Sequence, residues 1–261
     1  MITSVLLFAV GLVLLIKGGD WFVDGATGIA KRFNLPDIVV GATVVSIGTT
    51  LPEVMVSTTG ALAGSGAMAY GNAIGSIICN TALIAAISIT CNPGPVNVKS
   101  MKTPAIFFFC SAALYCFASY VLGEFPRWMG FLMLSIFVVY MVLTVRNGMK
   151  NPDASAEEEE ESKPKALWQE LLLLVAGAAV IAVGADLLVE HGQIIALKLG
   201  VPETVVALLF VALGTSLPEL VTTITSLKKG RASLGVGNVI GANVFNLVLV
   251  SGVAVSLAPF P

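Results

Sequence analysis

Residues 47–53 read I-G-T-T-L-P-E, and residues 213–219 read L-G-T-S-L-P-E. Aligned without a gap, 41–80 and 207–246 share 13 identities in 40 positions, and we call the constant shift between them the repeat offset. Each copy places one glutamate within a long apolar segment. An ionisable group is costly in such a segment and marks a functional site. Two of them in duplicated halves predict one site at a pseudo-two-fold axis.

The composition indicates a membrane protein. Of the 261 residues, 56% are hydrophobic and 11% are charged, and the mean hydropathy is +0.93, whereas soluble domains carry about 25% charged residues. The net charge of −2 and the absence of a basic stripe argue against a nucleic-acid partner. We therefore expect an integral protein of the inner or plasma membrane, surrounded by the lipid bilayer. The sequence does not indicate an oligomeric state.

Apolar segments and loop charges predict the topology. A spanning helix needs roughly 20 mostly apolar residues. The odd-numbered loops carry eleven of the fourteen basic residues and the even-numbered loops carry two. The positive-inside rule therefore places the odd loops in the cytoplasm and the N-terminus outside. The eight apolar segments lie at about 3–30, 36–63, 67–91, 103–122, 126–146, 168–196, 203–227 and 234–258.

The two copies carry opposite charge patterns around the motif. Lys228 and Lys229 follow the second copy, where the first has Leu62 and Ala63. Five spans in each repeat would invert the second copy, as in many secondary transporters. We expect an all-α, polytopic fold of inverted-topology repeats. Its parts are a five-helix repeat at 1–147, an acidic cytoplasmic linker at 148–166 and a second repeat, with three helices, at 167–261.

The duplication extends beyond the motifs. Asp20 aligns with Asp186 and Asp24 with Glu190, and packing or helix-end roles are the favoured interpretation of Asp20 and Asp186 over a role in ion entry. Pro93-Gly94-Pro95 aligns with Pro259-Phe260-Pro261, where the chain stops. The first repeat continues for two more spans. We therefore expect a ten-span parent of which these residues are a part, the alternative being a natural eight-span chain.

The motif supplies the oxygens of an ion site. Pro52 and Pro218 lack an N–H and disfavour the helix one turn back, which frees the carbonyls of Gly48 and Gly214. In a membrane, such carbonyls are tolerated where they line a wet cavity. A cation between the two breaks would satisfy them. Charges and hydroxyls come from Glu53, Glu219, Thr49, Thr50, Thr215 and Ser216.

The G-N-x-I-G stretches predict close helix packing beside the glutamates. Glycines four residues apart let a neighbouring helix approach. In the first copy this approach would bring Ser76 and Asn80 to the glutamate helix, and in the second copy it would bring Asn246. Ala242 replaces the hydroxyl of Ser76, so we expect an asymmetric site. The pairs are Gly71 with Gly75 and Gly237 with Gly241, and we interpret Asn72 and Asn238 as interhelical hydrogen-bonding residues.

The candidate ligands are all oxygen atoms, which are hard ligands and prefer hard cations. Calcium takes six to eight oxygens at about 2.3–2.6 Å in loose geometry, and two carboxylates would balance its charge. The same oxygens could hold several sodium ions. Magnesium fits less well because it keeps its waters, and soft metals do not fit these ligands. We expect no bound cofactor, with Ca²⁺ and Na⁺ as transported ions.

The paired motifs resemble the α-repeats of the cation/calcium exchanger superfamily, specifically its microbial sodium/calcium exchanger branch, over nearly the whole chain. The resemblance implies ten helices in two inverted halves, a midplane site, and exchange of sodium for calcium by alternating access, with helices one and six sliding across the motif helices. Asn246 stands where several members, including potassium-dependent ones, have Asp, which argues against potassium coupling. The implied ligands are Thr49, Thr50, Glu53, Ser76, Asn80, Thr215, Ser216, Glu219 and the carbonyls of Ser46 and Ala212, to which we add Asn246 as a candidate.

Other functions remain open from the residues alone. A buried carboxylate can carry a proton, so proton/calcium exchange is an alternative to sodium/calcium exchange. A passive cation channel can also use carboxylates and carbonyls, although filters usually surround a symmetric pore. The sequence lacks the Y-D and G-x-G-D signatures of an intramembrane aspartyl protease, which argues against that class of enzyme. We therefore expect a transporter and not an enzyme.

Overall fold

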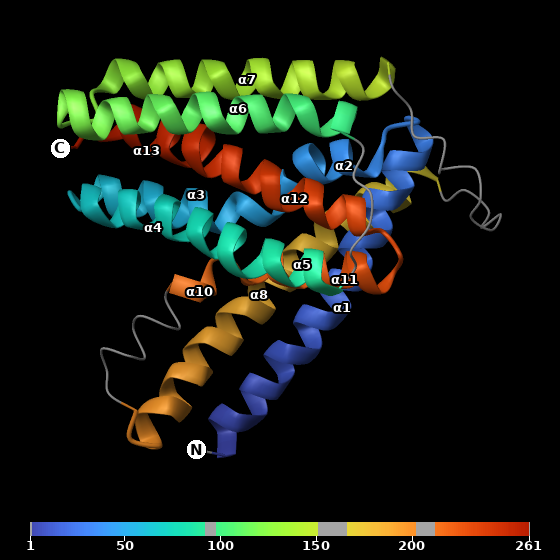
Figure 1. Cartoon of the computed structure of the whole chain (residues 1–261). Helices are drawn as coiled ribbons and strands as arrows, with labels where there is room; N and C mark the ends of the chain where they lie inside the picture. The colour runs from blue at the N-terminus through green and yellow to red at the C-terminus, as the bar shows by residue number, and fades with distance from the viewer. Residues whose placement is uncertain (1, 92–97, 151–165, 202–211, 261) are drawn as a thin grey trace.

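The computed structural model describes residues 2–91, 98–150, 166–201 and 212–260. The regular elements in these ranges are all helical, and several long helices contain a π-helical turn (Figure 1). In chain order they are α1 (Ile2–Arg32), α2 (Asp37–Val40), η1 (Gly41–Val45), α3 (Ser46–Leu62), α4 (Gly66–Cys79), η2 (Asn80–Ile84), α5 (Ala85–Cys91), α6 (Val98–Phe117), η3 (Ala118–Leu122), α7 (Arg127–Lys150), α8 (Leu167–Lys198), α10 (Ala212–Gly214), α11 (Leu217–Lys228), α12 (Ala232–Phe245), η6 (Asn246–Val250) and α13 (Ser251–Leu257).

The predicted all-α, polytopic class is confirmed. Within the described ranges, seven helices are long and apolar enough to cross a membrane, and their bounds follow the predicted segments closely. The remaining predicted segment, 203–227, lies partly outside the described residues, and its described part forms α10 and α11. Most of the predicted linker at 148–166 also lies outside the described residues. Helix α7 extends to Lys150, and the next described residue is Ala166.

The duplicated sequence produces duplicated local structure. Helix α4 begins at Gly66 and α12 at Ala232, and these two residues are counterparts under the repeat offset. The π-helical turns that follow begin at Asn80 and Asn246, which are counterparts as well. The matching sequence pattern therefore gives the same break in helical geometry in both copies. Turns of this kind are rare and often lie at functional sites.

Helices α1 and α8 pack against each other along their length. A Cβ built on Gly11 would lie 2.9 Å from the carbonyl oxygen of Gly184, and one on Gly25 would lie 2.6 Å from the backbone nitrogen of Leu174. Residue numbers rise along α1 as they fall along α8, so the two helices are antiparallel. They are the first helices of the two predicted repeats, and inverted repeats require this opposition. The pair lies obliquely beside the other helices (Figure 1).

The remaining helices form layers around α12. Helices α6 and α7 lie side by side on one face, and α3 and α4 lie on the other (Figure 1). A buried apolar cluster fills the space between these layers. It includes Tyr115, Met129, Met133, Tyr140, Phe245 and Val248. The cluster makes this block a packed body against which the α1–α8 pair rests.

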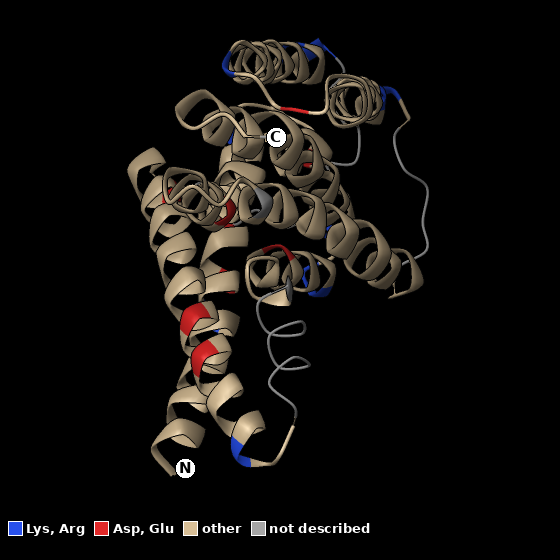
Figure 2. Ribbon diagram, turned by 90° about the vertical axis from the view of Figure 1, so that its left-hand side faces the viewer, with Lys and Arg blue, Asp and Glu red and all other residues tan. Residues whose placement is uncertain are grey.

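Loops of like parity meet at the same end of the molecule. Arg32, in the first loop, forms an ion pair of 3.0 Å with Glu170, which follows the fifth loop. At the opposite end, the backbone nitrogen of Phe125, in the fourth loop, donates to the carbonyl of Phe260, beyond α13. Charged residues are sparse along the helices (Figure 2). The odd loops thus share one end, and their cytoplasmic location stays a prediction.

Candidate ion-binding site

Two fully buried glutamates form the centre of the site. Glu53 lies on α3 and Glu219 in the first turn of α11, and both are 0% exposed. Among the described residues, no ion pair involves either carboxylate. Removing two charges from water without a partner is costly. The arrangement therefore suits a cation that both carboxylates bind.

Hydroxyl groups connect the glutamates across the two copies. Ser76 donates to Oε1 of Glu53 at 3.4 Å, and its hydroxyl lies 3.4 Å from that of Thr215. Thr50 donates to Oε1 of Glu219 at 3.5 Å. Each contact is at the long end of hydrogen-bond geometry. The structure thus brings these predicted residues together from both motifs, as loosely held oxygens.

Several buried oxygens of the predicted ligand residues have no hydrogen-bond partner among the described residues. Buried polar groups in proteins are nearly always hydrogen-bonded, so such groups call for an explanation. Cation binding would account for them, because an oxygen ligand offers its lone pairs to the ion. In the described part of the chain, the unpartnered atoms include Oε2 of Glu53, Oε2 of Glu219, Oγ of Ser216, Oδ1 of Asn80 and Oδ1 of Asn246.

The acidic ligands are few. The described residues contain no group of three or more His, Cys, Asp or Glu side chains that could hold a metal. A cation at this place would therefore take two carboxylates, and its other protein ligands would be hydroxyl, amide or carbonyl oxygens. Hard cations such as calcium and sodium prefer such ligands, and soft metals do not.

Asn72 ties the first glutamate helix to the second copy. Its Nδ2 donates to the backbone carbonyl of Glu53 at 3.2 Å and to Oγ of Ser57 at 2.8 Å. Its Oδ1 accepts from Thr215 at 3.4 Å. The interhelical role predicted for this asparagine agrees with these bonds. They also position two candidate ligands, a consequence that the sequence did not indicate.

Asn238 has the corresponding place in the second copy and holds the start of α3. Its Oδ1 accepts from Thr49 at 3.1 Å and from Ser46 at 3.3 Å. The hydroxyl of Ser46 also donates to the carbonyl of Gly41 at 2.9 Å. Ser46 begins α3, and Ala212, the other predicted carbonyl ligand, begins α10.

Tyr140 is a supporting residue that sequence analysis missed. Its hydroxyl donates to the carbonyl of Ala42 at 2.7 Å, and its side chain is fully buried. Ala42 lies in the π-helical turn η1, one turn before the motif. A π-helical turn disturbs the regular bonding of the helix, and Tyr140 supplies a partner for one carbonyl in it. Tyr140 lies within a uniformly apolar span, so no local sequence signal identified it.

The predicted helix breaks at the motif prolines occur in one copy only. Helix α3 continues through Pro52, so the break predicted there is wrong. In the second copy α10 ends at Gly214 and α11 begins at Leu217, with Pro218 in its first turn. Proline is well suited to a first turn because no N–H is needed there. Proline inside a membrane helix is tolerated where other groups re-satisfy the freed backbone.

The predicted close packing of the glycine pairs also differs between the copies. A Cβ on Gly237 would clash with the carbonyl oxygen of Ile38, and one on Gly241 would lie 2.6 Å from Cα of Ala42. Close approach is therefore confirmed in the second copy. In the first copy, no atom of the described residues lies within 4 Å of a Cβ on the paired glycines at 71 and 75. These two glycines line a cleft instead.

That cleft reaches the site from one end of the molecule. It has a volume of about 1690 Å³, and its walls come from α3, α4, α8 and the turn before α11. Ser76 and Thr215 lie on its wall near the glutamates. Met68, near the second loop, and Gln193, near the sixth loop, line it further out. The cleft therefore reaches the even-loop end, and along α8 it extends back to Leu174.

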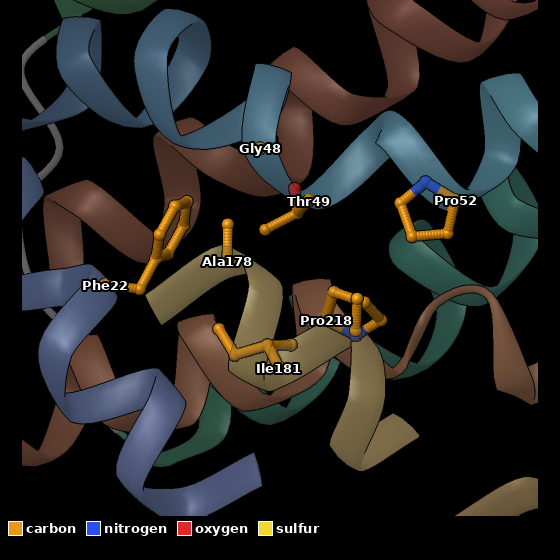
Figure 3. A pocket seen from close by; sticks show the side chains of 8 residues that line it. Phe22, Gly48, Thr49, Pro52, Ala178, Ile181 and Pro218 are labelled. Atoms are coloured by element: carbon orange, nitrogen blue, oxygen red, sulfur yellow. The ribbon is translucent and has the colours of Figure 1, made fainter. Parts of the chain in front are cut away.

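A small pocket marks where the α1–α8 pair meets the motif helices. Phe22 of α1, Ile181 of α8, Thr49 and Pro52 of α3, and Pro218 of α11 line it (Figure 3). The two motif prolines thus lie on the same pocket, each next to its glutamate in sequence. A movement of the pair across the motif helices would change the surroundings of both glutamates.

Comparison with known proteins identifies the family. The profile described as sodium/calcium exchanger protein matches residues 3–146 and 170–261. The chain is 36% identical to the putative antiporter CaxA of Alkalimonas amylolytica, covering 99% of this chain and 82% of that protein. It is 29% identical to the sodium/calcium exchanger MaX1 of Methanosarcina acetivorans, covering 95% and 81%.

A solved structure agrees with this result. The sodium–calcium exchanger NCX_Mj, soaked with sodium and strontium ions, superposes with a TM-score of 0.85 at 34% identity, covering 100% of this chain and 84% of that one. Fold, motif and sequence likeness therefore agree over nearly the whole chain. The chain belongs to the sodium/calcium exchanger family of integral membrane proteins.

Proposed function

We propose that this protein is a secondary active antiporter that exchanges sodium for calcium by alternating access. The observation that carries the proposal is the burial of Glu53 and Glu219, one from each copy of the motif, with no basic partner among the described residues. A calcium ion between them would balance both charges. Sodium ions bound to the same oxygens would exclude calcium, which is the competition that exchange requires.

The proposed ligands are oxygens from the two copies of the repeated segment. Thr50 and Ser76 already contact the carboxylates. Oxygens without a donor on Ser216, Asn80 and Asn246 would complete the shell. Calcium takes six to eight oxygens, and these side chains with the two carboxylates can supply that number. Thr49, Thr215 and the carbonyls of Ser46 and Ala212 are further candidates.

Access to the site would alternate between the two ends. The cleft connects Ser76 and Thr215 with the even-loop end, which the positive-inside rule places outside. At the odd-loop end, Gly19 of α1 packs on Thr225 of α11. Sliding of α1 and α8 across the motif helices would open one end and close the other.

Sodium coupling is preferred to proton coupling because the site offers hydroxyl and amide oxygens in addition to its carboxylates. A proton needs only a carboxylate, whereas sodium needs several oxygen ligands. Likeness to proteins named as sodium/calcium exchangers supports the same choice.

Transport into vesicles tests the proposal. Purified protein is placed in sodium-loaded liposomes, and calcium uptake is measured after dilution into sodium-free medium. We expect uptake that needs the sodium gradient, and loss of uptake in Glu53→Gln and Glu219→Gln. Uptake driven equally well by a pH gradient without sodium would favour proton exchange. Wild-type rates in both variants would disprove the site.

A further inference from the structure

The odd-loop end of the molecule carries an ion pair that sequence analysis did not predict. Lys229, just after α11, lies 2.7 Å from Oδ1 of Asp24 and 3.7 Å from Oδ1 of Asp20, both on α1. Its Nζ also donates to the backbone carbonyl of Asp20 at 3.0 Å. These contacts join a helix of the α1–α8 pair to the helix that carries Glu219.

A row of buried hydroxyls leads from Glu219 towards this ion pair. Thr222, Thr223 and Ser226 follow at spacings of three, four and seven residues, which places them on one face of α11, and each is 0% exposed. The hydroxyls of Thr222 and Thr223 have no hydrogen-bond partner among the described residues. In the first copy, the corresponding positions 56, 57 and 60 hold Val, Ser and Gly. The polar row is therefore a feature of the odd-loop end.

The even-loop end has the acids but lacks the lysine. Asp186 and Glu190 are the counterparts of the two α1 aspartates under the repeat offset, and they line the cleft. Ala63 stands where the second copy has Lys229. Neither acid on α8 forms an ion pair with any residue that the structure describes. Thus the ion pair lies at the odd-loop end, and the corresponding acids at the other end line the cleft.

We propose that Lys229, Asp20 and Asp24 form a gate that closes the odd-loop route to the ion site. The inference rests on the proposed antiport, because only a transporter needs a route at each end. When the gate is closed, α1 lies on α11, with Gly19 against Val221 and Thr225. When α1 slides, the ion pair and this contact separate, which opens a path along α11 between Glu219 and the odd-loop side. The single lysine then favours the conformation that is closed at this end.

Hydrogen–deuterium exchange of the full chain in lipid nanodiscs tests the gate. In Lys229→Gln, we expect backbone exchange at 19–26 and 221–229 to rise roughly two- to fivefold, the effect of losing a partly exposed ion pair. Lys229→Arg keeps the charge and should resemble the wild type. Lys228→Gln is the matched control, because it removes a neighbouring charge that is exposed. Equal exchange in Lys229→Gln and Lys228→Gln would overturn the proposal.

The internal duplication allows the opposite test, in which a lysine is added at the even-loop end. Ala63→Lys places a cation where the repeat offset predicts that Asp186 and Glu190 can reach it once the cleft closes. We expect faster exchange at 221–229, because this variant favours closure of the even-loop end. No change there would overturn the symmetry on which the gate depends.

A charge swap separates gating from general damage. If Lys229→Gln raises exchange throughout the chain, the double variant Asp24→Lys with Lys229→Glu, which reverses both charges of the pair, distinguishes a lost gate from a damaged fold. Restored protection supports the gate, and continued loss overturns it. Calcium uptake by the wild-type protein in the same lipid tests the proposed function by itself. Uptake without an effect of Lys229→Gln rejects the gate alone, whereas absence of uptake rejects the antiport.

Discussion

Replacement of Gly237 by alanine tests the packing that holds the second motif against the first. A Cβ at this position would clash with the carbonyl oxygen of Ile38 and lie 2.9 Å from that carbonyl carbon. Non-bonded carbon atoms prefer about 3.5–4.0 Å, so α12 must move by about 0.6 Å or more. Because the clashing atoms are backbone, no change of rotamer relieves them.

The expected loss of stability follows from this geometry. Overpacking costs about 1–3 kcal/mol, and we expect the upper half of this range for a backbone clash. Alanine recovers up to about 1 kcal/mol through its better helix propensity. The net loss is then about 1–2 kcal/mol, which lowers the Tm by about 2–8 °C. Calcium uptake should also fall, because the next residue, Asn238, holds Thr49 and Ser46.

Gly235→Ala is the matched control on the same helix. Its Cβ would first meet the Cγ2 methyl of Thr223 at 3.2 Å, which small adjustments can relieve. We expect a Tm within about 2 °C of the wild type, since the gain in helix propensity offsets the tight contact. Thermal unfolding of the purified proteins in detergent compares the two variants. A Gly237→Ala variant as stable as Gly235→Ala would refute the reasoning.

Two further substitutions separate ion binding from support of the fold. Ser76→Ala removes the hydroxyl near Glu53 and should weaken calcium binding about tenfold with little change in Tm, because one contact to a charged group is lost. Calorimetric titration would measure this loss of affinity. Unchanged affinity would exclude Ser76 as a ligand. Tyr140→Phe leaves the carbonyl of Ala42 without its donor, so the free energy of unfolding should fall by about 1–3 kcal/mol. Thermal unfolding would measure this loss of stability. A Tm equal to that of the wild type would show that the bond adds nothing to stability.

Much of the fold could be predicted from hydropathy and repetition. The spans follow apolar segments because helix is the secondary structure that satisfies its own backbone within a single segment in lipid. The π-helical turns at Asn80 and Asn246, which are counterparts under the repeat offset, show that the duplicated sequence carries duplicated local structure. The asymmetry between Ser76 and Ala242 also appears as predicted, because the serine contacts Glu53 and Thr215.

Other features depend on contacts between distant segments. Identical L-P-E triplets give a continuous helix at Pro52 and a helix start at Pro218. The triplets themselves do not distinguish the two copies, so the difference depends on the residues around them. The bond from Tyr140 to η1 and the ion pair of Lys229 with α1 join residues far apart in the chain. Sequence alone predicted neither, because periodicity does not indicate which helices touch.

Calcium binding at equilibrium tests the central claim most directly, namely that Glu53 and Glu219 form one site shared by calcium and sodium. Titration calorimetry would compare the wild type, Glu53→Gln, Glu219→Gln and the double variant, with and without sodium. A shared site predicts that each single variant loses nearly as much affinity as the double variant, and that sodium weakens calcium binding to the wild type. Full binding in either single variant, or binding unaffected by sodium, would contradict the account.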